Sequence, residues 1–359
     1  MTKFLTALLF CFTLCHAAPP LEEMIAQMIV IGFDGQKEGD KWVEQIAKDI
    51  KRQKIGGVIL HEKNIQTPTQ LKKLTHHLSS NAPQTLPLMV IVEDEGGEET
   101  PFGAKKGFSP LPSAYDIAKK SDIEEAQKAY EKRAEELFIG GITINLAPVL
   151  DLQPKNMNSI LRSYSSYEEI VTTYAMLFMN ALQKHSVMPV VKYFPSSGAN
   201  LWDNFSSIVD LTPTWRFEQL KPYYDLISVG NVEGVLMSHV LHTELDKSNP
   251  ALFSSLMIEG LLREKMHFEG LVFVDNLRTD SLSHTIDFKS RIVRSIQAGA
   301  DVLIFPNYFA DNASAPFTVS KIITDAVRSG EISKDRIALS YERIVKHKQK
   351  TRKRQSHVD

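Results

Sequence analysis

Cysteine is nearly absent from this chain: the two cysteines, Cys11 and Cys15, both lie close to the amino terminus. The chain beyond them has no thiol, which excludes a disulfide framework and a cysteine-containing zinc site there. Neither sign of charge predominates, since 41 Lys and Arg face 43 Asp and Glu and the formal net charge is -2. Without a basic stripe, the composition gives no electrostatic reason to expect nucleic-acid binding.

The hydrophobic content of 43% and the charged content of 23% are typical of a soluble globular protein with a sizeable core. The first 18 residues have the pattern of an export signal: Lys3, an apolar run from Phe4 to Leu14, then Ala17 and Ala18. The run is too short for a stable membrane span. We therefore expect removal of residues 1–18 and a periplasmic or secreted product. Leu14 is bulky for the residue before a lipidated cysteine, so lipidation of Cys15 is not favoured.

Eight short apolar runs alternate with amphipathic stretches of helical length. The runs are Met28–Phe33, Gly57–Leu60, Leu88–Val92, Ile142–Leu146, Met188–Lys192, Gly234–Ser238, Leu271–Val274 and Val302–Phe305. The stretches between them include Asp122–Phe138, Glu168–His185 and Lys289–Ala298. Continuous apolar strands indicate burial on both faces, as a parallel sheet covered by helices requires. The pattern predicts an α/β fold, a single-domain (β/α)8 TIM barrel.

A Rossmann-type sheet is the alternative fold, but no G-x-G-x-x-G motif follows the first strand. No linker or low-complexity segment divides the chain, so we expect one barrel over residues 19–345. Residues 346–359 form a basic tail, which we expect to be the solvated, frayed end of the last helix.

Polar residues follow several of the predicted strands, at the end where this fold class carries its chemistry. They are Glu93, Asp94 and Glu95; Asp151 with Arg162 beyond it; Lys192 and Tyr193 with Asp203 beyond them; His239; and Asp275 with Asn276. Such acids can also cap the next helix, and Asp275 alone would be structural about half the time. An unpaired lysine directly after an apolar strand is harder to explain without a function.

The residue types exclude other chemistries. No H-E-x-x-H or Cys/His set is present, so no metal site and no cofactor are expected. A G-x-S-x-G elbow is missing too, which argues against a Ser-His-Asp hydrolase. A ring of carboxylates with two cations remains, an arrangement suited to gripping sugar hydroxyls and stabilising an oxocarbenium-like transition state.

Seven segments resemble glycoside hydrolase family 3, in its single-domain bacterial β-N-acetylglucosaminidase branch. They are GGVIL at 56–60, VEDEGG at 92–97, GITINLAPVLDL at 141–152, RS at 162–163, KYFP at 192–195, MSHV at 237–240 and FEGLVFVDNL at 268–277. The likeness runs from about residue 21 to about residue 346. It implies the barrel fold and a retaining double displacement in which Asp275 is the nucleophile.

The resemblance also implies roles for the neighbouring residues. Glu93, Arg162 and Lys192 align with residues that hold the sugar's hydroxyls, and Tyr193 and His239 are expected in the same binding set. Asp203 aligns with the aspartate that orients a catalytic histidine. The family has Asp where this chain has Glu93, and the additional methylene could move the carboxylate by about 1 Å.

The larger departure follows the fifth strand. The branch reads Lys-His-Phe-Pro-Gly-His-Gly and then Asp-Ser-His, whereas this chain reads KYFPSSG at 192–198 and Asp203-Asn204-Phe205. The three histidines are replaced at positions 193, 197 and 205. Phe205 aligns with the general acid/base, and losing positioned acid/base catalysis typically costs 10²–10⁴-fold.

Two functions follow. The first is an exported glycosidase that removes terminal β-linked N-acetylglucosamine from peptidoglycan-derived or related glycans, with impaired proton transfer that Asp203 or His239 could partly supply. The second is a non-catalytic sugar-binding protein of the same fold. Either would act as a monomer on a carbohydrate, without nucleic acid.

Overall fold

The computed structural model describes residues 19–153, 162–197, 208–277, 286–306 and 315–355. Eight parallel strands form a closed barrel in chain order, with β8 pairing back onto β1. They are β1 (Ile29–Gly32), β2 (Gly57–Ile59), β3 (Met89–Val92), β4 (Ile144–Asn145), β5 (Met188–Phe194), β6 (Gly234–Met237), β7 (Leu271–Asp275) and β8 (Val302–Phe305). The predicted (β/α)8 barrel is thus confirmed.

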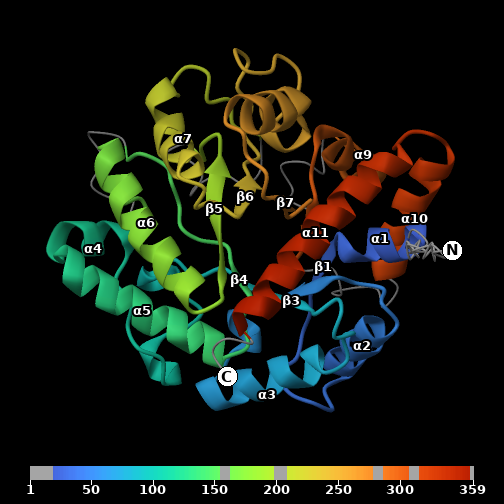
Figure 1. Ribbon diagram of the computed structural model, residues 1–359, viewed down its shortest axis with the longest axis horizontal. Helices are drawn as coiled ribbons and strands as arrows, with labels where there is room; N and C mark the ends of the chain where they lie inside the picture. The colour runs from blue at the N-terminus through green and yellow to red at the C-terminus, as the bar shows by residue number, and fades with distance from the viewer. Residues whose placement is uncertain (1–18, 154–161, 198–207, 278–285, 307–314, 356–359) are drawn as a thin grey trace, which may run out of the picture.

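Helices surround the strands (Figure 1). The α-helices are α1 (Leu21–Gln27), α2 (Lys41–Lys51), α3 (Pro68–Ser79), α4 (Ala114–Lys120), α5 (Ile123–Ile139), α6 (Glu168–Lys184), α7 (Lys221–Ser228), α9 (Phe288–Ala298), α10 (Ala315–Arg328) and α11 (Lys334–Gln355). Shorter 3₁₀ turns are η1 (Glu62–Asn64), η2 (Gly97–Glu99), η3 (Ala104–Lys106), η4 (Phe217–Leu220) and η5 (Ala251–Phe253), and η6 (Leu256–Lys265) is a π-helix.

Local sequence explains where helices begin. The Asp122 carboxylate accepts from the Glu125 N–H while Glu125 reaches back, a reciprocal cap at the start of α5. The Thr67 side chain caps α3 by accepting from the Gln70 N–H, and it is followed by Pro68, which is well suited to the first turn. These signals place the predicted amphipathic stretches within a residue or two of the observed helices.

The strands are buried on both faces, as their continuous apolar runs predict. Val30, Val58, Val90 and Val235 are all inaccessible to solvent. Gly32 lets the Pro306 carbonyl approach β1 closely, because a Cβ at this position would lie 1.8 Å from the carbonyl oxygen. This contact brings the end of β8 against the end of β1 at the mouth of the barrel.

The prediction of a solvated, frayed basic tail is wrong in part for the described residues 346–355: the segment is helical and Lys348 is buried, while Lys346, Lys350, Arg352 and Lys353 are exposed as predicted. Helix α11 continues to Gln355, and its second half crosses the end of the barrel where the strands begin (Figure 1). The Lys348 side chain is buried there and its ammonium donates to Oε1 of Gln27 at 2.6 Å and to the Gly56 carbonyl at 2.9 Å. Its Nζ satisfies backbone and amide acceptors that precede β1 and β2, which the charge pattern alone did not reveal.

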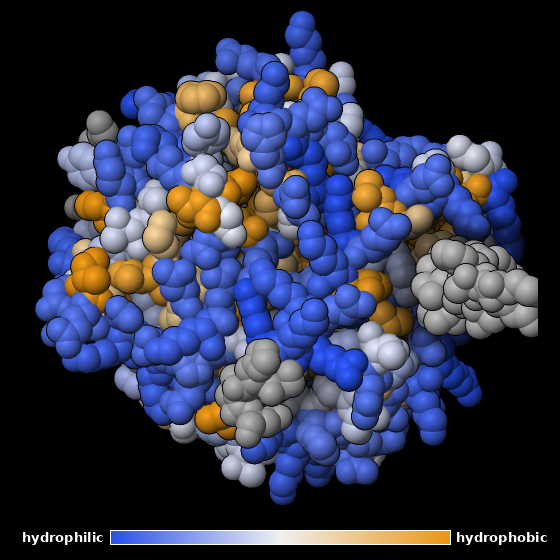
Figure 2. All heavy atoms as spheres, in the orientation of Figure 1, coloured by the Kyte–Doolittle hydropathy of each residue, from blue (hydrophilic) through white to orange (hydrophobic). Residues whose placement is uncertain are grey.

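The face that carries α11 is largely hydrophilic, with small and separated apolar patches (Figure 2). Within the described ranges, no helix combines the length and the apolarity needed to cross a bilayer. The predicted signal at residues 1–18 lies outside the described residues.

Candidate active site at the barrel mouth

The predicted strand-end residues converge at the carboxyl ends of the strands. Glu93 follows β3, Lys192 and Tyr193 lie near the end of β5, and Asp275 ends β7. Arg162, from the loop after β4, reaches the same cluster. The shared edge of a parallel barrel places these residues together.

Lys192 is the centre of the cluster. Its side chain is fully buried, and Nζ lies 2.5 Å from Oε1 of Glu93 and 2.5 Å from Oε1 of Glu95. Burial opposes the charge, yet the two carboxylates raise the pKa of Lys192 above its ordinary value. A buried ammonium requires such pairing, and Lys192 is therefore a charged, positioned donor at the mouth.

Arg162 clamps the same carboxylates from the opposite side. Its Nε donates to Oε2 of Glu95 at 2.5 Å, and its Nη2 donates to Oε1 of Glu95. The same Nη2 lies 3.5 Å from Oε1 of Glu93 and donates to the Tyr193 hydroxyl at 2.7 Å. This fork geometry is the one arginine uses for carboxylates. Glu95, which the sequence reading placed at the strand end without a role, is the main anchor of Arg162.

Tyr193 occupies the first of the three histidine positions. Its hydroxyl donates to Oε1 of Glu93 at 3.2 Å while accepting from Arg162. Burial raises the pKa of Tyr193, so the phenol stays protonated at neutral pH. Tyrosine here extends the polar cluster without providing a group that exchanges protons near pH 7.

Glu93 and Asp275 are two carboxyl groups whose pKa values are shifted in opposite directions. Burial opposes ionisation of Glu93, but Lys192 and then Arg162 lower its pKa to about 2. Burial, and then the charge of Glu93, raise the pKa of Asp275 to about 7. Titratable pairs whose environments separate their pKa values mark acid–base and nucleophilic sites.

Asp275 has a fixed backbone and an unsatisfied side chain. Its carbonyl oxygen lies 2.8 Å from Nε2 of His239, so that the imidazole N–H donates to it. Its Oδ1 is buried and has no hydrogen-bond partner among the described residues. Buried polar atoms are normally paired, so an orphaned carboxylate oxygen at a barrel mouth is a candidate reacting atom.

His239 is predicted to bind the sugar, and the structure places its Nε2 on the backbone carbonyl of Asp275. Burial lowers the pKa of His239, so the ring is mainly neutral at pH 7. The ring therefore orients β7 at the site, and it is poorly suited to supply the proton that Phe205 cannot. Asp203 and Phe205 lie outside the described residues.

Asp151 is a strand-end residue for which the sequence patterns predicted no role. Both carboxylate oxygens accept from the Ser197 N–H, at 3.1 and 2.9 Å, and Oδ2 also accepts from the Ser197 hydroxyl. Burial raises the pKa of Asp151 to about 6. Ser197 stands at the second of the three histidine positions. Its hydrogen bonds fix the chain that follows β5 to Asp151.

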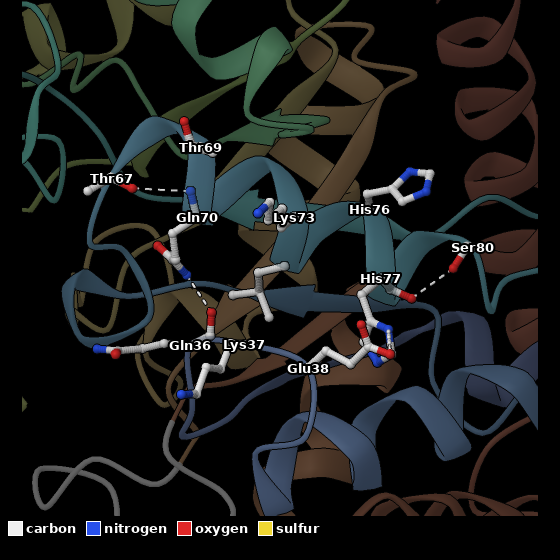
Figure 3. Close-up of a pocket in the computed structure, with 11 residues that line it drawn as sticks. Gln36, Lys37, Glu38, Thr67, Thr69, Gln70, Lys73, His76, His77 and Ser80 are labelled. Carbon is white, nitrogen blue, oxygen red and sulfur yellow. Dashed lines mark hydrogen bonds and ion pairs between the residues drawn. The ribbon is translucent and has the colours of Figure 1, made fainter.

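A groove of about 530 Å³ lies elsewhere, between the loop after β1 and α3 (Figure 3). Its wall is polar, with Gln70 donating to the Gln36 carbonyl and His77 facing Glu38. None of the strand-end carboxylates lines it. Within the described ranges, no three His, Cys, Asp or Glu side chains are grouped to hold a metal ion.

Comparison with known proteins agrees with this geometry. Residues 20–347 match the family described as the glycosyl hydrolase family 3 N-terminal domain. The chain belongs to glycoside hydrolase family 3. It is 30% identical over 262 residues to a β-hexosaminidase of Methylococcus capsulatus, covering 70% of this chain and 75% of that protein. It is 29% identical over 267 residues to one of Shewanella frigidimarina, covering 72% of this chain and 76% of that protein.

Solved family 3 structures share the fold. A β-N-acetylglucosaminidase from Paenibacillus sp. is 28% identical with a TM-score of 0.81, covering 93% of this chain and 63% of that one. This chain thus spans less than two thirds of that protein's length. A β-N-acetylhexosaminidase from Beutenbergia cavernae is 21% identical with a TM-score of 0.81, covering 93% of this chain and 100% of that one, and shows the fold alone. Family membership makes the chain a glycosidase, and the predicted family resemblance is confirmed.

Proposed function

We propose that this family 3 glycosidase removes terminal β-linked N-acetylglucosamine by a retaining mechanism with Asp275 as nucleophile. The observation that carries the proposal is the Asp275 carboxyl group, which has a buried, unpartnered Oδ1 and a pKa raised to about 7. The names of the curated relatives support the sugar, since they are β-hexosaminidases.

The reaction proceeds in two displacements at the anomeric carbon. An ionised Asp275 oxygen attacks that carbon, the bond to the leaving oxygen breaks, and a covalent glycosyl ester forms. Water then attacks the same carbon and releases the carboxylate, so the anomeric configuration is retained. Glu93, Arg162 and Lys192 hold the sugar hydroxyls through both steps.

Proton transfer to the leaving oxygen is the slow step of this mechanism. The leaving oxygen must gain a proton, and the family's histidines are replaced by Tyr193, Ser197 and Phe205. Neither a phenol of raised pKa nor a serine hydroxyl exchanges protons readily near pH 7. We infer slow turnover of natural disaccharides, which is the physical consequence of a high-pKa leaving group without an acid.

The proposed location is the periplasm or the cell exterior, because of the signal pattern in residues 1–18. An exported enzyme would meet peptidoglycan-derived glycans directly. We propose that it acts there as a monomer.

The deciding test is hydrolysis of aryl and disaccharide N-acetyl-β-glucosaminides by purified protein, from about pH 4 to pH 8. Release of N-acetylglucosamine above buffer, with retention of configuration, supports the proposal. No release from any of these substrates contradicts it.

A second function, non-catalytic sugar binding, is favoured by one observation: Tyr193 is tied to both Glu93 and Arg162, in a cluster that is complete without a titrating histidine. Calorimetry with N-acetylglucosamine-containing muropeptides would show binding without cleavage. Absence of binding at millimolar ligand would exclude this function as well.

A further inference from the structure

His61 is a mouth residue that neither the sequence patterns nor the mechanism above uses. It comes two residues after β2 ends, and the pairing of Ile59 with Ile91 places it beside Glu93 at the end of β3. Its N–H donates to Oδ1 of Asn64 at 2.9 Å. It therefore stands in the same ring of strand ends as the carboxylate cluster.

Asn64 ties this position to the neighbouring strand. The Asn64 side chain is fully buried, and its amide donates to the carbonyl oxygens of Phe33 at 3.0 Å and Gly35 at 2.8 Å. The loops after β1 and β2 are thus joined through one side chain. His61 is held on rigid backbone, which is what a residue that selects among ligands requires.

The imidazole lies near the backbone carbonyl of Pro306, which Gly32 allows to approach closely. Its Nε2 is buried and has no hydrogen-bond partner among the described residues. Nε2 is thus a polar atom whose hydrogen bond these residues do not supply.

The charge state of the ring suits a hydrogen bond with a neutral ligand. Burial, and then Lys63, lower the pKa of His61, although Glu93 and the Pro306 carbonyl act in the opposite direction. The ring is therefore mainly neutral near pH 7. A neutral imidazole can exchange a hydrogen bond with a sugar hydroxyl, which both donates and accepts.

We propose that His61 is a specificity-determining residue, whose Nε2 forms a hydrogen bond with one hydroxyl group of the bound sugar. The inference rests on the proposed function. Lys192 and Arg162 are already directed at Glu93 and Glu95, so His61 adds to the site a polar atom that has no partner among the described residues. A site that offers an unpaired buried polar atom rejects a ligand lacking the matching hydroxyl.

The test uses binding, so that slow turnover does not obscure it. Calorimetry would compare methyl N-acetyl-β-D-glucosaminide with its 3-, 4- and 6-deoxy analogues. Wild type should bind at least one deoxy analogue more weakly than the parent glycoside. In the His61→Phe variant, one such analogue should bind as tightly as the parent. The parent ligand should then bind the His61→Phe variant about 3- to 10-fold more weakly, the effect of one neutral hydrogen bond.

Two further variants sharpen the result. His61→Gln places an amide oxygen near the position of Nε2 and should recover part of the discrimination. His61→Asn offers no group at that position and should behave like the Phe variant, which keeps the test decisive if His61→Phe does not fold. His76→Gln, an exposed histidine on α3, is the matched control and should bind like wild type.

The possible failures are distinguishable. If wild type binds the parent and His61→Phe keeps every discrimination of the wild type, the role of His61 is overturned while the proposed function stands. If wild type binds no N-acetylglucosaminide at millimolar concentration, the proposed function fails, and the role of His61 fails with it.

Discussion

Nε2 of His239 lies 2.8 Å from the carbonyl oxygen of Asp275, so a buried imidazole holds the last peptide of β7. The hydrogen bond constrains the backbone of the proposed nucleophile and leaves the side chain unpaired at Oδ1. The reacting group is therefore positioned through its main chain, and its carboxylate is available for a ligand. Four predictions follow from this site and from the opposite end of the barrel.

Asp275→Asn should abolish glycosidase activity, because an amide cannot form the glycosyl ester. It should also stabilise the free protein at alkaline pH. The folded state keeps the Asp275 proton up to about pH 7, whereas the unfolded chain releases it near pH 4, so wild-type stability falls as pH rises through this window. Thermal unfolding at pH 8 should show a gain on the order of 1–3 kcal/mol. Unchanged activity would mean that the nucleophile is misassigned.

The pH dependence of kcat/KM should have an acidic limb near pH 7, because Asp275 must be ionised to attack and its pKa is about 7. Glu93→Gln removes the neighbouring charge that raises this pKa. The limb should then move to lower pH by roughly 0.5–1 unit, whatever the loss in binding. Glu98→Gln, at an exposed position close in sequence, serves as the control. A limb that stays in place in the Glu93 variant would contradict the electrostatic coupling.

Substrates with leaving groups that need no protonation, such as dinitrophenyl glycosides, should react far better than natural disaccharides. Phe205→His combined with Ser197→His should reduce the gap, with rescue of roughly 10-fold or more on a poor leaving group. Ser197→His removes the hydroxyl that donates to Asp151 and keeps the backbone N–H bonds to the same carboxylate. Phe205→His alone is the matched single variant. If neither variant gains activity and dinitrophenyl substrates are inert, the defect lies in the nucleophile or in binding.

Lys348→Met should change how stability depends on pH. Burial lowers the pKa of Lys348 to about 7, while an unfolded lysine titrates near 10.4. Between these values the unfolded chain binds the additional proton, so the free energy of unfolding of wild type should rise with pH relative to the variant. Denaturant titrations from about pH 7 to pH 10 would measure the difference. Lys350→Met, whose ammonium pairs with Glu233 and is half exposed, is the control. Parallel curves for wild type and Lys348→Met would contradict the prediction.

Much of the fold could be predicted because the strands are continuous apolar runs between turn residues. All eight were located to within about two residues, and β5 differs mainly by including Tyr193 and Phe194. Strand period and length are local properties, so a single sequence reveals them. The tail was misread because burial of Lys348 depends on Gln27 and Gly56, which are distant in sequence.

Part of the site could be predicted because the functional residues of this fold lie at the carboxyl ends of the strands. Glu93, Lys192, Arg162 and Asp275 were found in this way, and their convergence follows from barrel closure. His61 was not found, because a histidine after an apolar run is no signal by itself. Its importance depends on a missing partner at Nε2 and on the Pro306 carbonyl, both of which only the folded chain shows.

The first and last helices meet across the start of the strands, where Tyr341 of α11 donates to Oε1 of Glu23 at 3.0 Å and Lys348 reaches Gln27. A ribosome adding 5–20 residues per second makes the whole chain in roughly 20–70 s. Throughout almost all of that time, the acceptors at Gln27 and Gly56 have no Lys348 side chain to bind. The contacts that α11 makes with the start of the strands therefore form only after the last residues of the chain have been made.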